Sequence, residues 1–310
     1  MTESYSHQPV LLKEVLEALD IKPQGKYVDG TFGRGGHARE ILQCLGPEGR
    51  LLVMDKDPQA IEVARQLFND DTRVIIEKGS FAMIKQKVAE QAWSGAVDGI
   101  LLDLGVSSPQ LDAAERGFSF RRDGVLDMRM DTESGRSAAE WIAQVKEQEL
   151  ATVLREYGEE RFAKRIARAI VKARETQPIT TTKQLAAIIA QANPKWETGK
   201  DPATRSFQAI RIFINNELED LKTCLAQVAD LLKTGGRLVI ISFHSLEDRI
   251  VKRFIREQAK GDNYPPGLPV TLAQLNPKLK PLGKAIQPSA AEVAANPRAR
   301  SSVLRVAEKI

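Results

Sequence analysis

The chain has 310 residues, of which 42% are apolar and 28% charged, a balance typical of one or two globular domains. No apolar stretch reaches the ~18–20 residues of a bilayer span, and the first residues lack the pattern of a secretory signal. Its two cysteines, Cys44 and Cys224, lie too far apart for a disulfide framework, a cysteine zinc site or an iron–sulfur cluster. We therefore expect a soluble cytoplasmic protein without a metal.

The charge is unevenly distributed along the chain. The formal net charge is +4, but residues 249–310 hold 12 Lys and Arg against 4 Asp and Glu, a net +8, so the preceding residues sum to −4. A basic segment on a mildly acidic body suggests a polyanionic partner. Charge alone leaves open the alternative of a solvated basic tail.

Short β-branched runs alternate with helical patterns in the first third of the chain. We expect strands at 27–29, 50–55, 73–77 and 97–105, and helices at 38–45, 58–68 and 81–92. From about 137 to 233 only helical periodicity is present, including one long helix over 203–233. Residues 234–245 return to a strand, with Gly235 and Gly236 ending the helix before it.

This pattern predicts an α/β fold with a parallel sheet, interrupted by an all-helical insert. We place the α/β domain at 1–113 and 206–310, and the insert at 114–205. Residues 261–290 carry six of the 15 prolines and read as a mobile loop or one that orders on binding. The run SSVLRVAEK (301–309) could add an edge strand.

A glycine-rich turn follows the first predicted strand. The run Asp29-Gly-Thr-Phe-Gly-Arg-Gly-Gly-His37 allows a ligand to approach the backbone closely at the start of a helix. Its spacing is neither that of the dinucleotide fingerprint nor that of a Walker loop. Asp29 at the strand end would repel a pyrophosphate and would favour a cationic or hydroxyl-rich ligand.

Three further side chains lie at the ends of the next strands. Asp55 is placed to accept hydrogen bonds from ribose hydroxyls, whereas Asp57, before Pro58, is assigned to a helix N-cap. Phe81 could stack on adenine or belong to the core, and Asp103 would lie near the ligand's amino group. An adenosine ligand that meets several carboxylates suggests S-adenosylmethionine, with NAD disfavoured by the spacing.

The chemistry is expected in the loop after the fourth strand, where Ser108 and Pro109 lie. A hydroxyl beside a proline carbonyl can hold the N–H bonds of an exocyclic amine for direct methyl transfer, although the same residues could simply form a turn. Cys44 and Cys224 lie in predicted helices, which disfavours attack on a cytosine ring by a thiolate. His244 could accept a proton or cap the helix that follows it.

Basic and aromatic residues suggest surfaces for a nucleic acid. A stripe of Arg161, Arg165, Arg168 and Lys172 could follow a phosphate backbone or be a solvated face. The run RGFSFRR (116–122) interleaves Phe118 and Phe120 with basic residues, which suits base stacking. Arg298 and Arg300 form a second basic strip, and Trp141 is either a stacking residue or part of the core.

Several motifs together resemble one family from end to end. They are HQPVLLKEVLEAL, YVDGTFGRGGHARE, LLDLGVSSPQLDAAERGFSF, DGVLDMRMD, YGEERFAKRIARAI, TRSFQAIRIFINNEL, GGRLVIISFHSLEDRIVKRF and NPRARSSVLRVAE. The chain resembles the RsmH (MraW) family of bacterial 16S rRNA (cytosine-N4) methyltransferases. The weakest match is at about 259–290.

This resemblance implies a class-I S-adenosylmethionine-dependent methyltransferase fold (Rossmann-like) with a helical insert. The implied reaction methylates N4 of one cytidine in the decoding centre of 16S rRNA. The implied donor-binding residues are Gly35, Gly36, His37, Asp55, Phe81, Asp103 and Gln110, of which His37 and Gln110 come from the resemblance alone. Because Gln110 follows Pro109 where amino-methyltransferases place an aromatic residue, a stacking ring would come from Phe118, Phe120 or Trp141.

The leading hypothesis is therefore an enzyme that acts on 16S rRNA within the small ribosomal subunit, with no membrane partner. One rival is an amino-methyltransferase acting on DNA or protein, and another is a non-catalytic RNA-binding assembly factor that retains the fold. An NAD-linked oxidoreductase is a distant third. The sequence leaves the oligomeric state open, with a homodimer as one option.

Overall fold

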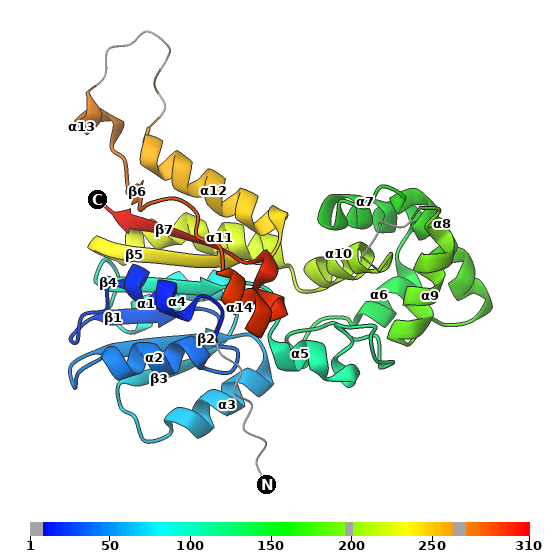
Figure 1. The fold of residues 1–310 in the computed structure, drawn as a ribbon, viewed down its shortest axis with the longest axis horizontal. Coiled ribbons are helices and arrows are strands. Elements are labelled where there is room, and N and C mark those ends of the chain that lie inside the picture. The colour runs from blue at the N-terminus through cyan, green and yellow to red at the C-terminus, as the bar shows by residue number, and fades with distance from the viewer. Residues whose placement is uncertain (1–8, 196–200, 263, 265–270) are drawn as a thin grey trace. The chain divides into compact units, whose positions relative to one another are not determined.

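A computed structural model describes residues 9–195, 201–262, 264 and 271–310. The chain forms two compact units. The sheet unit comprises Met1–Gly105 and Leu218–Ile310, and the helical unit comprises Val106–Glu217. Both are drawn in Figure 1.

The sheet unit is built on seven strands in the order β3-β2-β1-β4-β5-β7-β6. Their bounds are β1 (Lys26–Asp29), β2 (Arg50–Asp55), β3 (Val74–Lys78), β4 (Val97–Asp103), β5 (Leu232–Ser242), β6 (Leu279–Pro281) and β7 (Val303–Lys309). The first five strands pair in parallel, whereas β7 runs antiparallel to both β5 and β6. The run β3-β2-β1-β4-β5 is the order of a Rossmann sheet, so the predicted α/β class is confirmed.

Helices cover both faces of this sheet (Figure 1). One face packs against α1 (Leu12–Leu19), α2 (Gly36–Cys44) and α3 (Pro58–Phe68), and the other against α4 (Ile84–Glu90), α11 (Glu217–Leu231) and α12 (Ser245–Lys260). Alternate residues of each central strand enter the two cores: Leu51 and Val53 of β2 face one core, and Leu52 and Met54 the other. This double burial explains why the strands read as nearly continuous apolar runs.

The remaining elements of the sheet unit are short. They are the 3-10 helices η1 (Phe81–Met83) and η3 (Pro297–Ser301) and the helices α13 (Leu272–Leu275) and α14 (Ala290–Ala295). No helix among the described residues is long and apolar enough to cross a membrane.

Two predictions for the last part of the chain need correction. The strand predicted as an edge is instead β7, which is inserted between β5 and β6. The edge position belongs to β6, within the segment 261–290 that the proline content made look like a loop. Pro281 can end β6 because an edge strand needs no hydrogen bond from every N–H. Residues 263 and 265–270 of the same segment lie outside the described residues.

The helical unit contains α5 (Ser108–Asp112), η2 (Ala114–Arg116), α6 (Ala138–Gln144), α7 (Glu147–Gly158), α8 (Ala163–Thr176), α9 (Thr182–Ala192) and α10 (Thr204–Ile214). Ser137 and Thr181 begin α6 and α9 as N-caps in capping boxes, each with an acid or amide three residues later. Among its described residues, the only pairing of strand type is a single bridge between Val125 and Thr181.

The helical unit is longer at both ends than the predicted insert of 114–205. It begins at Val106, because the turn after β4 and α5 pack with it, and α10 extends it to Glu217. The single long helix predicted over 203–233 is wrong, since α10 and α11 are separate helices. Asn216 lies between them with φ 54°, a left-handed conformation that interrupts a helix.

Candidate functional site

Three acidic residues end three neighbouring strands of the sheet unit. Asp29 is the last residue of β1, Asp55 of β2 and Asp103 of β4. Because β2, β1 and β4 are adjacent and parallel, their carboxyl ends meet at one edge of the sheet. The chain reverses its direction of strand addition between β1 and β4, which is where open α/β sheets bind ligands.

The glycine-rich turn after β1 is folded back onto these strand ends. Its Gly30 N–H donates to the Leu101 carbonyl over 3.0 Å, and the Phe32 N–H donates to the Met54 carbonyl over 2.9 Å. A Cβ on Gly30 would lie 2.6 Å from Leu102 and 3.2 Å from Phe81, so this position has no room for a side chain. The turn therefore brings bare backbone close to Asp29, Asp55 and Asp103.

Helix α2 begins at the end of this turn. Its N-cap, Gly35, has φ 75°, a conformation that side chains other than glycine rarely adopt. A Cβ on the next residue, Gly36, would lie 2.4 Å from the Pro9 side chain. The two glycines let α2 start tightly against the strand ends, with its first N–H groups at the turn.

Hydrogen bonds from the backbone fix the orientation of the acids. The N–H groups of Gly33 and Asp57 donate to the two carboxylate oxygens of Asp55, over 2.8 and 2.9 Å. The Thr31 N–H donates to Asp29 Oδ1 over 3.1 Å, and Thr31 Oγ1 accepts the Asp103 N–H over 2.6 Å. Each carboxylate oxygen of Asp55 keeps a second lone pair that can accept a hydrogen bond from a hydroxyl group.

Burial raises the pKa of all three acids. The pKa of Asp29 rises to about 7, that of Asp55 to about 6 and that of Asp103 to about 8. Desolvation is the largest cause in each case, and the repulsion between Asp29 and its neighbours adds to it. Oδ1 of Asp103 is buried and has no hydrogen-bond partner within the described residues. Such a cluster favours a ligand that carries positive charge and N–H or O–H donors.

His37 adds another acceptor to this cluster. Its Nε2 lies 3.0 Å from the Val10 carbonyl oxygen and its Nδ1 lies 3.7 Å from Asp103 Oδ2. A carbonyl only accepts, so Nε2 carries the proton, and burial lowers the pKa of the ring to about 4. His37 is therefore neutral at pH 7, and its Nδ1 lone pair faces Asp103 across a gap that a donor group could bridge.

Asp57 and Phe81 take the places expected of them near the site. Asp57 Oδ1 accepts the Gln59 N–H over 3.0 Å, so Asp57 is the N-cap of α3, as predicted. Phe81 begins η1 just after β3 and is half-buried against the core on the α11 side of the sheet. Its Cβ lies 3.2 Å from the position that a Cβ on Gly30 would take, so the Phe81 side chain begins beside the glycine-rich turn.

His244 follows β5 at the same edge of the sheet and directly precedes α12. Its Nε2 lies 3.1 Å from Oε1 of Glu247, a buried acid. The second oxygen of Glu247 accepts the Phe243 N–H over 2.9 Å. His244 is at the N-cap position of α12, with Glu247 three residues later, as the capping interpretation expected, and its role as a proton acceptor stays a prediction.

The predicted residues Ser108, Pro109 and Gln110 belong to the helical unit. They lie in α5, whose N-cap is Ser107 and which has Pro109 in its first turn. Oε1 of the buried Gln110 accepts the Ser107 N–H over 2.9 Å, which closes a capping box. The Ser-Ser-Pro sequence thus forms a capped helix start, a more rigid arrangement than an open turn.

The three aromatic residues predicted to stack on a base differ in exposure. Trp141 is 2% exposed and packs on Phe213 with ring centroids 4.6 Å apart, and Phe118 is 6% exposed in the same core. Because their faces are covered by the unit's own side chains, we do not carry these two forward as stacking residues. Phe120 is only partly buried, edge-on to Phe207 at 4.7 Å.

The predicted basic residues are exposed. Arg298 and Arg300 flank the buried Ala299 in η3, and Arg165, Arg168 and Lys172 form the outer face of α8. Arg168 lies 3.5 Å from Glu147. The buried face of α8, with Ile166 and Ile170, is the one predicted from the helical period.

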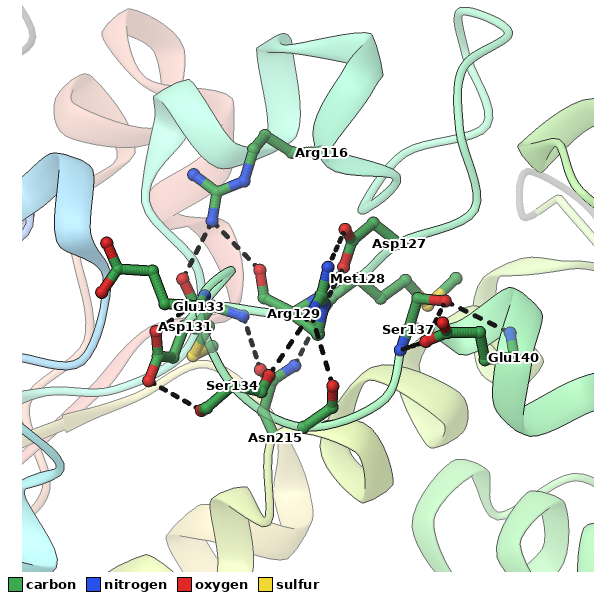
Figure 2. A network of polar contacts seen from close by, with 12 residues as sticks. Arg116, Asp127, Met128, Arg129, Asp131, Glu133, Ser134, Ser137, Glu140 and Asn215 are labelled. Atoms are coloured by element: carbon green, nitrogen blue, oxygen red, sulfur yellow. Dashed lines mark hydrogen bonds and ion pairs between the residues drawn. The ribbon is translucent and has the colours of Figure 1, made fainter.

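Sequence reasoning missed a polar network in the helical unit, which Figure 2 shows. The buried Arg116 donates to the carbonyl oxygens of Arg129 and Met130, over 3.0 and 3.1 Å. Asn215 accepts the Met130 N–H over 2.7 Å and donates to the Met128 carbonyl, also over 2.7 Å. Arg129 and Asp127 form a two-pronged ion pair at 2.8 and 2.9 Å.

This network holds a strained loop in place. Met128 is fully buried with φ 63°, which is unusual for a residue other than glycine. The loop is fixed from one side by Arg116 and from the other by Asn215, just beyond the end of α10. The motif DGVLDMRMD and the pair Asn215-Asn216 are the sequence features at this network. Neither predicts that Met130 and Asn215, which are 85 residues apart in the chain, form a hydrogen bond.

Comparison with known proteins identifies the family. The model of the MraW methylase family matches residues 4–310. The chain belongs to this family. A curated relative from Nitrosococcus oceani, named ribosomal RNA small subunit methyltransferase H, is 58% identical over 308 residues, covering 99% of this chain and 98% of the relative.

A relative of the same name from Thioalkalivibrio sulfidiphilus is 58% identical over 306 residues, covering 98% of each chain. A solved structure titled an rRNA methylase from Streptococcus thermophilus aligns with a TM-score of 0.42 and 11% identity. The alignment covers 96% of this chain and 93% of the other. The family model and the two 58% identical relatives confirm the resemblance drawn from the motifs at the level of the family.

Proposed function

We propose that this protein transfers a methyl group from S-adenosylmethionine to the exocyclic N4 of one cytidine in 16S rRNA, in the decoding centre of the small ribosomal subunit. Membership of the MraW methylase family and the names of the two relatives support an rRNA of the small subunit as substrate. The observation that carries the donor half of the proposal is the cluster of Asp29, Asp55 and Asp103 beside the glycine-rich turn.

The residues of this cluster fit the donor part by part. The α-amino and sulfonium groups are cationic and suit Asp103, Asp29 and the Nδ1 lone pair of His37. The ribose hydroxyls suit the remaining lone pairs of Asp55, and the adenine suits the face of Phe81. Gly35 and Gly36 expose backbone groups that the donor can approach closely. Gln110 is included among the donor-binding residues because of the family resemblance alone.

The main contribution of the protein to this reaction is to position the methyl group of the donor against the amine of the cytosine. When bound, the donor supplies an electrophilic methyl group, so that one S–C bond breaks, one N–C bond forms and one proton leaves the amine. Ser108 Oγ and the second lone pair of the Pro109 carbonyl, which also accepts the Ala113 N–H over 2.9 Å, accept hydrogen bonds from the two N–H groups of the cytosine amine and aim its lone pair. His244, oriented by Glu247, is the candidate acceptor of the released proton.

Recognition of the RNA uses groups that remain exposed. Arg298, Arg300 and the basic face of α8 contact phosphates, and Phe120 is the remaining candidate for stacking on the target base. A cytidine buried in an RNA helix cannot offer N4 to an enzyme, so the target base must be unstacked before transfer.

A direct test incubates the purified protein with labelled S-adenosylmethionine and small-subunit rRNA from a strain lacking the gene. Mass spectrometry of the digested nucleosides should show N4-methylcytidine, and mass spectrometry of nuclease fragments of the same rRNA should place it at one position. Asp55→Ala should bind donor at least tenfold more weakly, because it removes the only side chain assigned to the ribose. Asp71→Ala, which removes a carboxylate paired with Arg73, is the matched control and should bind donor normally.

The same experiment separates the rival functions. Label that appears in DNA or protein but not in rRNA would favour an amino-methyltransferase of another substrate class. Tight rRNA binding with no transfer to any substrate, even at saturating donor, would favour a non-catalytic assembly factor. Ser108→Ala should lower turnover more than donor affinity, whereas equal losses in both would indicate a purely structural α5.

A further inference from the structure

Helix α12 carries a row of basic side chains that have no role in the proposed donor binding, methyl transfer or RNA contacts. Arg249, Lys252, Arg256 and Lys260 recur at intervals of three or four residues and are all exposed. We call these four residues the α12 stripe. Steps of four residues advance about 6 Å along a helix, so the stripe forms one continuous basic line on its outer face.

The opposite face of α12 is firmly attached to the sheet unit. Val251 and Ile255 are buried in the core shared with α4 and α11. Asp248, near the start of the helix, is gripped by Arg305 of β7 through two hydrogen bonds of 2.6 and 3.0 Å. In Figure 1 the helix lies alongside β5 and β7. The basic line is therefore presented on a rigid support.

The acids of α12 do not pair with the two central residues of the stripe, Lys252 and Arg256. Glu247 is buried, Asp248 pairs with Arg305, and Glu257 pairs with Arg253 over 2.8 Å. Within the described parts of the chain, Lys252 and Arg256 have no carboxylate at ion-pair distance. Leaving two cations unpaired on a fixed helix keeps a positive potential that surface pairing would otherwise reduce.

The surroundings of α12 favour RNA over a membrane as the partner. A helix that lies on a lipid surface must expose an apolar face beside its basic one, but here Val251 and Ile255 are covered by the core. A phosphate backbone needs only a line of exposed cations. The stripe also begins the segment 249–310, whose net charge is +8.

We propose that the α12 stripe is a separate contact surface for the phosphate backbone of folded rRNA, which the sheet unit provides in addition to Arg298 and Arg300. The proposal rests on the proposed function for the identity of the RNA. It predicts that the stripe contributes to RNA affinity and to its salt dependence while leaving donor binding alone.

The test compares Lys252→Gln/Arg256→Gln with Lys13→Gln/Lys222→Gln. The control loses the same charge from exposed lysines of α1 and α11, each of which pairs with a nearby glutamate. Binding to a small-subunit rRNA transcript is measured without donor from 50 to 300 mM salt, a range chosen to span roughly physiological ionic strength. Calorimetry with S-adenosylhomocysteine reports donor binding and the folded state of each variant.

We expect the stripe variant to bind rRNA roughly tenfold more weakly at low salt, with the slope of log K against log salt reduced by about one to two. The control should keep the wild-type affinity and slope, and both variants should bind S-adenosylhomocysteine normally. Equal rRNA affinity and slope in the stripe variant and the control would overturn the proposal, as would a preference of the stripe for an acidic protein over RNA. Because binding is measured without methyl transfer, failure of the proposed reaction would be seen separately.

Discussion

The two units use their polar side chains in opposite ways. In the sheet unit, backbone N–H groups donate to the carboxylates of Asp29 and Asp55. The pKa values of Asp29, Asp55 and Asp103 are raised, and Oδ1 of Asp103 has no hydrogen-bond partner within the described residues. In the helical unit, the side chains of Asp127, Arg129 and Asn215 are hydrogen-bonded to partners within the unit (Figure 2). Buried acids with raised pKa values and an unbonded oxygen are typical of a binding site. Side chains whose hydrogen bonds are made within the unit are typical of residues that stabilise the fold.

This contrast gives a rule that variants can test. Substitutions at the strand-end acids should change donor affinity and leave the fold intact or more stable. Substitutions of conspicuous residues in the helical unit should change stability first.

The largest expected effect is at Trp141. Replacing this 2%-exposed ring by alanine should lower the free energy of unfolding by about 3–5 kcal/mol, because it leaves a large cavity beside Phe213. Phe120→Ala is the comparison, since that ring is only partly buried and should cost less. Chemical denaturation measures both. If Trp141→Ala kept full stability but lost rRNA binding, Trp141 would be a residue that stacks on the RNA and not a core residue.

The next effect is at Asn215. Asn215→Ala leaves the Met130 N–H and the Met128 carbonyl without their partner, at about 1–3 kcal/mol for each buried group that loses its hydrogen bond. Thermal unfolding should show the loss. Ser134→Ala, which removes an exposed hydroxyl from the same loop, is the control and should unfold near the wild-type temperature. An unchanged transition for Asn215→Ala would show that the loop finds other partners.

In the sheet unit, Asp103→Asn should weaken donor binding by about 10- to 100-fold, the equivalent of one hydrogen bond to a charged group. The same variant should not destabilise the ligand-free protein. The pKa of Asp103 is about 8 in the folded state, against an ordinary value of 3.8, so its stabilising proton is lost as the pH rises toward 8. The unfolding temperature of the wild type should therefore fall relative to that of Asp103→Asn from about pH 4 to about pH 8, and the difference should stay level above pH 8.

The smallest effect is a pH dependence of donor affinity. A cationic ligand binds the deprotonated acids, whose pKa values are about 7 for Asp29 and about 8 for Asp103. Affinity for S-adenosylmethionine should rise with pH between 6 and 8, by about tenfold in all where binding requires the loss of the Asp29 proton alone. Calorimetry in buffers of different ionisation enthalpy would detect the released protons. A flat profile would show that these acids are already ionised.

Much of the sheet unit could be predicted because its signals are local. Each of the first four strands is a short apolar run that ends near a polar residue or a glycine turn, and parallel pairing then brings Asp29, Asp55 and Asp103 together. The N-cap role of Asp57 was also readable, since a short acid precedes proline at a helix start. The position of His37 beside Asp103 could not be predicted from the spacing. It depends on the contact of the ring with the Val10 carbonyl, and no local sequence pattern indicates that contact.

The helical unit resisted prediction because its decisive contacts are long-range. Helical period placed α8 and its buried face correctly, but it ran α10 and α11 together, since the left-handed Asn216 breaks no apolar pattern. Arg-Gly-Phe-Ser-Phe-Arg reads as a binding strip, yet Phe118 is needed by the core and Arg116 by the loop of Met128. Composition cannot distinguish an aromatic residue displayed to a partner from one claimed by packing.

The place of β7 between β5 and β6 has a consequence for how the protein is made. Residues 303–309 follow every other element in chain order, yet both neighbouring strands depend on them for hydrogen bonds. During synthesis, β5 waits with an open edge until this segment arrives, and a chain cut short before Val303 would keep that edge exposed to other unfinished chains. Completion of the sheet thus depends on the strand that is synthesised after every other element.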